Sequence, residues 1–286
     1  MIRIGSAALT ATISPRGAEL QSLTDRQGRG YLWDGDAAWW GGRSPILFPV
    51  IGVVNGGTIR VDGRAYTMPK HGVVRHRDFA LVEAGDSAAT FRLEADAETL
   101  AAYPFEFALE VSYRIEDATL AMQARVENRG AAAMPASFGF HPAFRWPLPG
   151  GERDGQRLVF EHAEHEPIRR IDPAGQLQAR TFPSPIVGDT LTLEDGLFEE
   201  DALILDGLWS RAATLESPGA RSLRIEWPGM PLLGVWTKPG APFICIEPWQ
   251  GVADPQGYAG EFRDKPGVVE IPPEGSRTFE MRVTLA

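Results

Sequence analysis

The stretch FEFALEVSYRIE, residues 105–116, decides the fold class, because apolar and polar side chains alternate along most of its length. One face carries the apolar side chains of Phe105, Phe107, Leu109, Val111, Tyr113 and Ile115. The opposite face is mostly polar and carries Glu106, Glu110, Ser112 and Arg114. Alternation with a period of two residues is typical of a half-buried strand. The stretch therefore predicts a β-strand with one face in a core.

The same alternation recurs along the chain in TLAMQARVEN (119–128), SLRIEW (222–227) and FEMRVTL (279–285). The 31 glycines and 23 prolines divide the chain into short segments, as a protein of many strands requires. Asn55-Gly56 and Asp62-Gly63 are hairpin signals. The best helix candidate is DAETLAAY (96–103), which begins with an Asp and is followed by a Pro. With no repeat or linker evident, we expect one all-β domain over residues 1–286, a large sandwich of antiparallel sheets.

Composition excludes several classes of function. A net charge of −10 argues against nucleic acid as the partner, because a phosphate backbone requires a basic surface. It also argues against binding to anionic membranes. The single cysteine excludes an internal disulfide framework and any multi-cysteine metal site. With no secretory signal evident at the N-terminus, the expected location is the cytoplasm.

Known nucleotide and hydrolase motifs are absent: there is no Walker A loop, no GxGxxG that opens a helix and no GxSxG elbow. HAEHE (162–166) carries two histidines, but not in the HExxH order. Its glutamates predict a solvated charged loop rather than a metal site, since charge clusters of this kind usually lie on the surface.

Two histidines lie in contexts that indicate a pocket. His141 in SFGFHPAFRWP (137–147) is surrounded by aromatic residues, including Phe140, and Pro142 should end a strand directly after it. The alternative is a core histidine bonded to a backbone carbonyl. His71 in MPKHGVVRHRDF (68–79) precedes Gly72, and glycine permits the close approach of a ligand. For Lys70, His76 and Arg77 in the same segment, a solvated hairpin is the favoured interpretation.

Glu247 ends the apolar strand APFICI of APFICIEPWQG (241–251). Period two places it on the same face as Phe243 and Cys245, and charged side chains are rarely buried unpaired. Such a held carboxylate suits a general base. The alternative is a structural ion pair with Lys238. Pro248 is expected to end the ladder, and Trp249 offers a flat surface on which a sugar ring can stack. A lone thiol in an apolar strand is usually inert, so Cys245 is not expected to be a nucleophile.

Four motifs occur in order: RSPILFPVIG (43–52), MPKHGVVR (68–75), FGFHPAF (138–144) and GVWTKPGAPFICIEPWQGVAD (234–254). Together they resemble the aldose 1-epimerase superfamily, the galactose mutarotase-like proteins, and in particular its bacterial branch of loosely assigned sugar epimerases. ATISPRGAELQSLTD (11–25) fits this pattern too, so the resemblance covers essentially the whole chain.

The resemblance implies a β-supersandwich and a cofactor-independent isomerase that interconverts the α and β anomers of an aldose. It places the general base at Glu247, the general acid at His141 and a sugar-contacting histidine at His71. Arg75 matches a common arginine of the bacterial branch. Substrate contacts are also expected from three further residues, Trp249, Lys238 and Phe140. No metal or other cofactor is expected, and the partner is a small sugar.

Two positions depart from the family pattern. Many relatives have a substrate-binding arginine where this chain has Val53, although Arg75 or Arg43 could contact hydroxyls instead. The sugar-binding Asp of galactose-specific members has only a weak counterpart, Asp206. Two alternative functions therefore stay open. One is a hexose 6-phosphate epimerase that holds its phosphate with Lys70, Arg75 and Arg77, and the other is a sugar-binding protein without catalysis.

Overall fold

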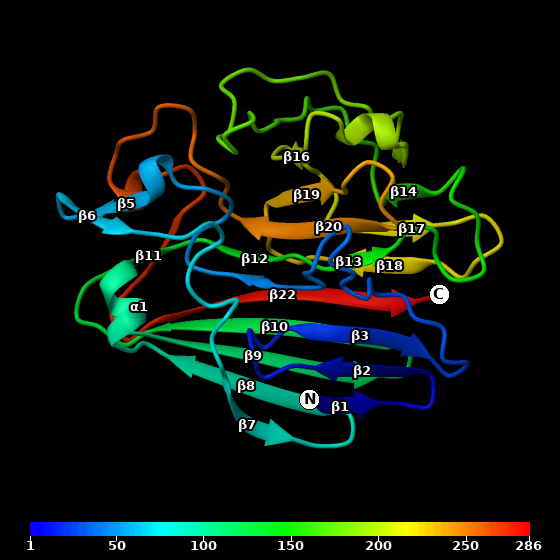
Figure 1. The fold of residues 1–286 in the computed structure, drawn as a ribbon, viewed down its shortest axis with the longest axis horizontal. Coiled ribbons are helices and arrows are strands. Elements are labelled where there is room, and N and C mark those ends of the chain that lie inside the picture. The colour runs from blue at the N-terminus through cyan, green and yellow to red at the C-terminus, as the bar shows by residue number, and fades with distance from the viewer.

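The computed structural model describes residues 1–286 and consists almost entirely of β-strands joined by turns (Figure 1). The largest sheet has nine strands, all paired antiparallel. In spatial order they are β15 (Thr190–Thr192), β14 (Arg157–Phe160), β17 (Ala212–Glu216), β18 (Leu223–Glu226), β22 (Ser276–Leu285), β10 (Thr119–Asn128), β9 (Phe107–Glu116), β8 (Ala88–Glu94) and β7 (Ala80–Ala84). The stretch 105–116 thus supplies β9, and its predicted apolar face is buried.

A second sheet of six strands carries the candidate site. Its strands are β16 (Leu203–Leu205), β19 (Leu232–Trp236), β20 (Phe243–Gln250), β12 (Phe138–Phe140) and β4 (Ile46–Leu47), with β13 (Ala143–Arg145) also paired to β20. Three smaller sheets complete the strands: β1 (Ile2–Gly5), β2 (Leu9–Ile13) and β3 (Leu20–Asp25); β5 (Thr58–Val61) and β6 (Arg64–Thr67); and β11 (Met134–Ala136) and β21 (Val269–Ile271).

The two large sheets pack face to face over one core, which confirms the prediction of an all-β antiparallel sandwich. Phe138 of β12 stacks on Phe279 of β22 with ring centroids 4.7 Å apart. In Figure 1, β20 and β12 lie above β22 and β10, and β1 to β3 cover part of β8 to β10. The hydrophobic cluster between the sheets contains 65 buried residues, so burial of apolar surface stabilises the arrangement.

Helical structure is confined to four short pieces: α1 (Ala97–Ala102) and the 3₁₀ turns η1 (Asn55–Gly57), η2 (Asp195–Phe198) and η3 (Phe262–Asp264). The predicted helix at 96–103 is confirmed as α1. Asp96 caps it by accepting from the backbone N–H groups of Glu98 and Thr99. Arg77 forms ion pairs with Asp96 and Glu98. The structure contains no helix with the length and hydrophobicity needed to cross a membrane.

Of the two predicted hairpin turns, one is confirmed and one is wrong. Asp62 and Gly63 form the two-residue turn between β5 and β6, both with positive φ. Asn55-Gly56 instead lies in η1, before β5 begins. The Asn55 amide donates to the carbonyls of Pro255 and Tyr258, so contacts with a distant turn override the local hairpin signal.

Candidate active site

A cavity of about 200 Å³ opens on the six-stranded sheet, and we call it the inner cavity. Its ionisable lining groups come from four separate segments: Lys70, His71, Arg75, His141, Asp201 and Glu247. Three indoles, those of Trp40, Trp236 and Trp249, form much of the remaining wall. The predicted residues Glu247, His141, His71, Arg75 and Trp249 therefore meet in one cavity.

Glu247 lies in the middle of β20, where all eight residues are buried. Its carboxylate is on the same face as Phe243, Cys245 and Trp249, as period two predicts. Burial raises the pKa of the Glu247 carboxyl well above its ordinary value, and the Trp249 indole opposes this shift only in part. The ion pair with Lys238 considered from the sequence does not form, because Glu247 faces His141 instead.

Trp249 fits beside Glu247 because each neighbouring strand has a glycine where the indole lies. Gly139 of β12 pairs with Trp249 itself, and Gly234 of β19 pairs with Glu247. A Cβ atom at Gly234 would lie 2.5 Å from the Trp249 ring, and one at Gly139 would lie 2.7 Å from it. Real Cβ atoms do not approach so closely, so both glycines are needed to seat the indole.

The prediction that Pro248 ends the ladder is wrong, since β20 continues to Gln250. The Ile246 N–H donates to the Pro142 carbonyl at 3.2 Å, and alternate backbone nitrogens of a strand face the same neighbour. The Pro248 nitrogen therefore faces the gap between β13, which pairs with residues 243–245, and β12, which pairs with residues 249–250. In that gap a missing N–H breaks no ladder bond with β19.

His141 follows β12 directly, at the strand end that the sequence predicts. Its Nε2 lies 3.2 Å from Oε2 of Glu247. The Trp40 ring stacks on the imidazole at 4.9 Å, and Trp236 approaches it edge-on at 6.1 Å. Burial lowers the pKa of His141 to about 3. The side chain is thus fixed by aromatic contacts, while its Nδ1 has no hydrogen-bond partner in the protein.

The Glu247–His141 pair favours a net charge of zero, because burial disfavours the charged form of each group. Two arrangements have zero charge: a carboxylic acid beside a neutral imidazole, and a carboxylate beside an imidazolium. They differ only in which of the two groups carries the proton; Oε2 of Glu247 and Nε2 of His141 lie 3.2 Å apart without forming a hydrogen bond. A pair coupled this closely titrates as a unit, so it can accept one proton and donate another without changing its total charge.

His71 is held as a neutral donor. Its Nδ1 accepts a hydrogen bond of 3.1 Å from the Gly52 N–H, which assigns the ring proton to Nε2. Burial, followed by the charges of His141, Lys70 and Arg75, lowers the pKa of His71 well below its ordinary value. The close turn requires Gly72, since a Cβ there would lie 1.9 Å from the Phe48 carbonyl oxygen.

Arg75 lines the inner cavity without forming an ion pair, and its buried Nε has no hydrogen-bond partner. Val53 also lines the cavity. A Cβ at Gly175 would lie 3.1 Å from Val53 Cγ2, so the 171–178 loop rests on the Val53 side chain. The loop thus occupies space into which a longer side chain at position 53 would extend.

Several sequence-predicted contacts lie elsewhere. Phe140 is fully buried and packs edge-on against Phe138 in the core, because alternation along β12 turns it away from the cavity. Arg77 is occupied by the α1 carboxylates. Arg43 donates to the Gln21 carbonyl, and Asp206 pairs with Arg169; neither residue lines the cavity.

HAEHE is only partly the solvated loop that its composition predicts. His162 and His165 are exposed. Glu164, however, is buried and accepts hydrogen bonds from the Trp209 and Ser210 backbone N–H groups. Because these backbone donors compensate for the lost hydration, the carboxylate can be buried in a structural role.

Among the polar and aromatic residues of the inner cavity, the sequence did not predict Trp40, Trp236 and Asp201, and it favoured a solvated position for Lys70. The Trp39-Trp40 pair in an otherwise small and polar segment was a usable signal, since two adjacent indoles rarely serve a solvated turn. Asp201 carried no such signal. Its position depends on a loop that approaches the sheet only in the folded chain.

One cluster has ligand atoms close enough to hold a metal ion: His141, Cys245 and Glu247, within 4.8 Å of one another. Burial, and then the Glu247 charge, raises the pKa of the Cys245 thiol well above its ordinary value. A thiol is a good metal ligand only as thiolate, so this environment weakens Cys245 as a ligand.

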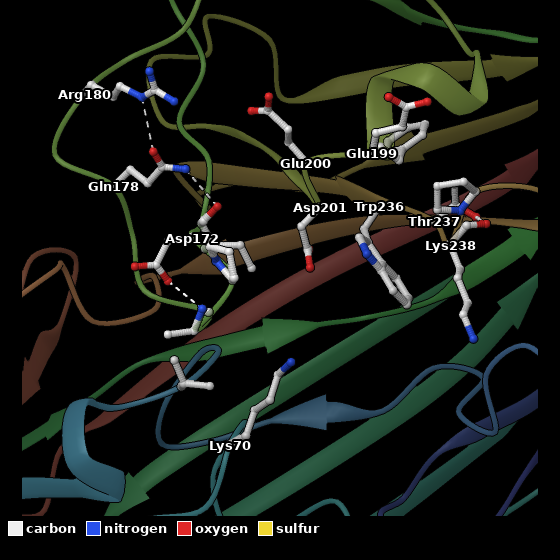
Figure 2. Close-up of a pocket in the computed structure, with 17 residues that line it drawn as sticks. Lys70, Asp172, Gln178, Arg180, Glu199, Glu200, Asp201, Trp236, Thr237 and Lys238 are labelled. Carbon is white, nitrogen blue, oxygen red and sulfur yellow. Dashed lines mark hydrogen bonds between the residues drawn. The ribbon is translucent and has the colours of Figure 1, made fainter.

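A second and larger cavity of about 740 Å³ adjoins the inner one, and we call it the outer cavity. Figure 2 shows Lys70 on one side of it, with Asp201 and Trp236 directed toward the same space from the other. Lys238 lines this outer cavity rather than the inner one.

Comparison with known proteins gives a consistent result. The family model described as aldose 1-epimerase matches residues 1–260. The chain is 32% identical over 288 residues to the chromosomal protein LacX of Lactococcus lactis subsp. lactis, with 95% of each chain covered. A galactose mutarotase-like protein from Lactobacillus casei is similar along the full length of both chains, with 33% identity and a TM-score of 0.93. A galactose mutarotase related enzyme from Lactobacillus acidophilus has 25% identity and a TM-score of 0.90, with 99% of this chain and 96% of that chain covered.

Proposed function

Because the chain belongs to the aldose 1-epimerase family, we propose that it interconverts the α and β anomers of an aldose in the inner cavity. The observation that carries this proposal is the 3.2 Å contact between Glu247 Oε2 and His141 Nε2 at a buried, tryptophan-walled site. A carboxyl group and an imidazole at this distance suit a reaction that needs one proton acceptor and one proton donor.

In the proposed reaction, the Glu247 carboxylate accepts the proton of the anomeric hydroxyl while the His141 imidazolium protonates the ring oxygen. The bond between C1 and the ring oxygen breaks, and an open-chain aldehyde forms. This step leaves Glu247 protonated and His141 neutral, which is the form of the pair that burial of each group favours. After rotation about the C1–C2 bond, the same two transfers run in reverse on the other face of C1.

The remaining inner-cavity groups would bind and orient the sugar. The His71 Nε2–H and the Arg75 guanidinium can donate to hydroxyl or ring oxygens, and Trp249 can contact an apolar sugar face. Holding the ring against both catalytic groups makes the proton transfers effectively intramolecular. We further propose a single domain, a cytoplasmic location and no requirement for a cofactor.

The phosphorylated-hexose alternative has partial support, since Lys70 and Arg75 both line the inner cavity. Its third predicted cation, Arg77, is paired with Asp96 and Glu98 instead. A gain in kcat/KM for glucose 6-phosphate over glucose that disappears in Arg75→Ala would favour this alternative. Equal or lower kcat/KM for the phosphate ester would exclude it.

The deciding experiment is magnetisation exchange between α and β anomeric protons by NMR, on a panel of aldoses with and without protein. Wild type should accelerate exchange for at least one sugar, and Glu247→Gln and His141→Asn should not. Glu116→Gln and His165→Asn, both at exposed positions, are the matched controls and should retain the wild-type rate. Full activity in Glu247→Gln would refute the mechanism. Sugar binding with no acceleration by wild type would indicate a sugar-binding protein without catalysis.

A further inference from the structure

The outer cavity is continuous with the inner cavity through a shared neck. Six residues line both: Val53, Lys70, Ile171, Gly175, Asp201 and Trp236. The inner cavity of about 200 Å³ lies below the range of about 300–1,000 Å³ typical of drug-sized ligand sites, which fits one sugar ring. The outer cavity is more than three times larger. The proposed chemistry uses only the inner cavity, so the outer one has no role in it.

The lining of the outer cavity is rich in hydrogen-bonding groups of both charges. It contains one more carboxylate than cations; the charged groups are Lys70, Arg180, Lys238, Asp172, Glu199, Glu200 and Asp201. The Asp172 carboxylate accepts hydrogen bonds from two backbone N–H groups and the Gln256 amide. None of the other six forms an ion pair, and all six are exposed. Three of the six form one hydrogen bond each within the protein: Arg180 donates to Gln178, Lys238 donates to the Trp39 carbonyl, and Asp201 accepts from the Ala202 N–H. Exposed donors and acceptors of both signs, none of them in an ion pair, suit a neutral polyol better than an anion.

The loops around this cavity are held by specific bonds and do not depend on a ligand for their shape. The Arg170 guanidinium donates to the carbonyls of Leu197, Glu200 and Asp201. Asp172 closes the turn that carries Ala174. The outer cavity is therefore a preformed site, and a preformed site loses less conformational entropy when a ligand binds.

The orientation of a sugar in the inner cavity follows from the proposed chemistry. The free anomeric carbon C1 must lie against Glu247 and His141, which line the inner cavity only. In a pyranose ring C4 lies directly opposite C1. A substituent on the C4 oxygen is therefore directed away from the catalytic pair, toward the neck and Trp236.

We propose that the outer cavity is a second sugar subsite, and that the preferred substrate is the reducing end of a 1→4-linked disaccharide or longer oligosaccharide. This inference rests on the proposed function, because the position of C1 defines the orientation. In it, Trp236 at the neck contacts the rings near their linkage, and Glu199, Glu200 and Lys238 bind hydroxyls of the second ring.

The kinetic test compares sugars that share one reducing ring. Anomer exchange is measured for D-glucose, maltose, cellobiose, isomaltose and D-glucose 6-phosphate, and in parallel for D-galactose and 4-galactobiose. We expect kcat/KM for the best 1→4 disaccharide to exceed that of its own monosaccharide by about tenfold, the equivalent of one or two added hydrogen bonds. Isomaltose should gain less. A monosaccharide or D-glucose 6-phosphate that exceeds every disaccharide would overturn the proposal.

A steric variant tests the location of the subsite. Ala174→Trp fills the outer cavity from the Asp172 turn and should reduce the ratio of disaccharide to monosaccharide kcat/KM by about tenfold. Ala179→Trp is the matched control, since Ala179 is equally exposed but lines neither cavity. The same ratio in both variants would place the second ring elsewhere and refute the assignment.

Binding to Glu247→Gln separates this inference from the proposed function. Saturation-transfer difference NMR with maltose, cellobiose and 4-galactobiose should show magnetisation on both rings, and Ala174→Trp should remove it from the non-reducing ring. Two-ring contacts without exchange by wild type would support the subsite and refute the epimerase. Exchange with contacts confined to the reducing ring would support the epimerase and refute the subsite.

Discussion

The two cavities are adjacent but are built from different parts of the fold. The inner cavity takes Glu247 and Trp249 from β20, and His141 from the end of β12. The outer cavity is formed mainly by loops, at residues 171–180, 198–201 and 236–239. Strands paired on both sides hold side chains more precisely than loops do. Under the two proposals, the sheet holds the catalytic pair, while the loops contact whatever is attached to the sugar.

The electrostatics of the two cavities differ in the same way. Glu247 and His141 are 2% and 7% exposed. Burial raises the pKa of Glu247 and lowers the pKa of His141, so it favours the neutral form of each group. Glu199, Glu200 and Lys238 in the outer cavity are exposed, so solvent screens their charges. A change in the inner cavity should therefore alter rate and pH dependence, whereas a change in the outer cavity should alter substrate preference.

The largest expected effect is that of Glu247→Gln. Loss of the general base should reduce anomer exchange by a factor of about 10² to 10⁴. The same change should stabilise the fold at neutral pH. The folded-state pKa of Glu247 is raised, so wild-type stability falls as pH rises above the unfolded value. Thermal melts should show a Tm advantage of the variant that grows between pH 5 and pH 8; an advantage that shrinks with pH would contradict the raised pKa.

Next in size is the pH dependence of kcat/KM in wild type. The Glu247–His141 pair needs one shared proton. It takes up a second proton only as pH falls to the lowered His141 pKa of about 3. It loses the shared proton as pH rises through the raised Glu247 pKa. Activity should thus persist in mild acid and decline on the alkaline side. A profile that falls on the acid side near pH 6, as a free imidazole would give, would contradict this assignment.

Gly139→Ala should have an intermediate effect on both activity and stability. Its Cβ would lie 2.7 Å from the Trp249 ring and 2.8 Å from Ile51 Cδ1, and overpacking of this kind costs about 1–3 kcal/mol. Chemical denaturation measures the loss. Gly196→Ala is the control, since a Cβ there meets no atom within 4 Å and the residue lacks a positive φ. Equal stability of the two variants would show that Trp249 can shift to accommodate the methyl group.

The smallest global effect is expected from Arg170→Met. The change removes the hydrogen bonds to the carbonyls of Leu197, Glu200 and Asp201. Because these bonds hold one loop, amide hydrogen exchange should accelerate at residues 197–202 and stay unchanged in β20. Anomer exchange of a monosaccharide should change less than that of a disaccharide. Faster hydrogen exchange in β20 as well would show that the two regions are not separable.

Predictions from the sequence succeeded where a local pattern determines the outcome. Alternation located β9 and β10 and placed Glu247 on the same face of β20 as Phe243 and Cys245, and the Asp96 cap located α1. They failed where distant segments compete with the pattern. Asn55-Gly56 became a 3₁₀ turn because the 255–258 turn accepts the Asn55 amide. Phe140, one residue before His141, belongs to the core because successive side chains along a strand point to opposite faces of the sheet.

By itself, the sequence determined several of the strands, their apolar faces, and that Glu247 and His141 lie in or beside strands with apolar neighbours. These properties depend on period-two geometry and on the cost of burying charge, both of which are local. Only the tertiary structure decided that the two side chains meet at 3.2 Å, that Trp40 and Trp236 enclose them, and that Asp201 and Lys70 form the neck. Those contacts join residues far apart in the chain, and pairing of β20 with β12, β13 and β19 brings them together.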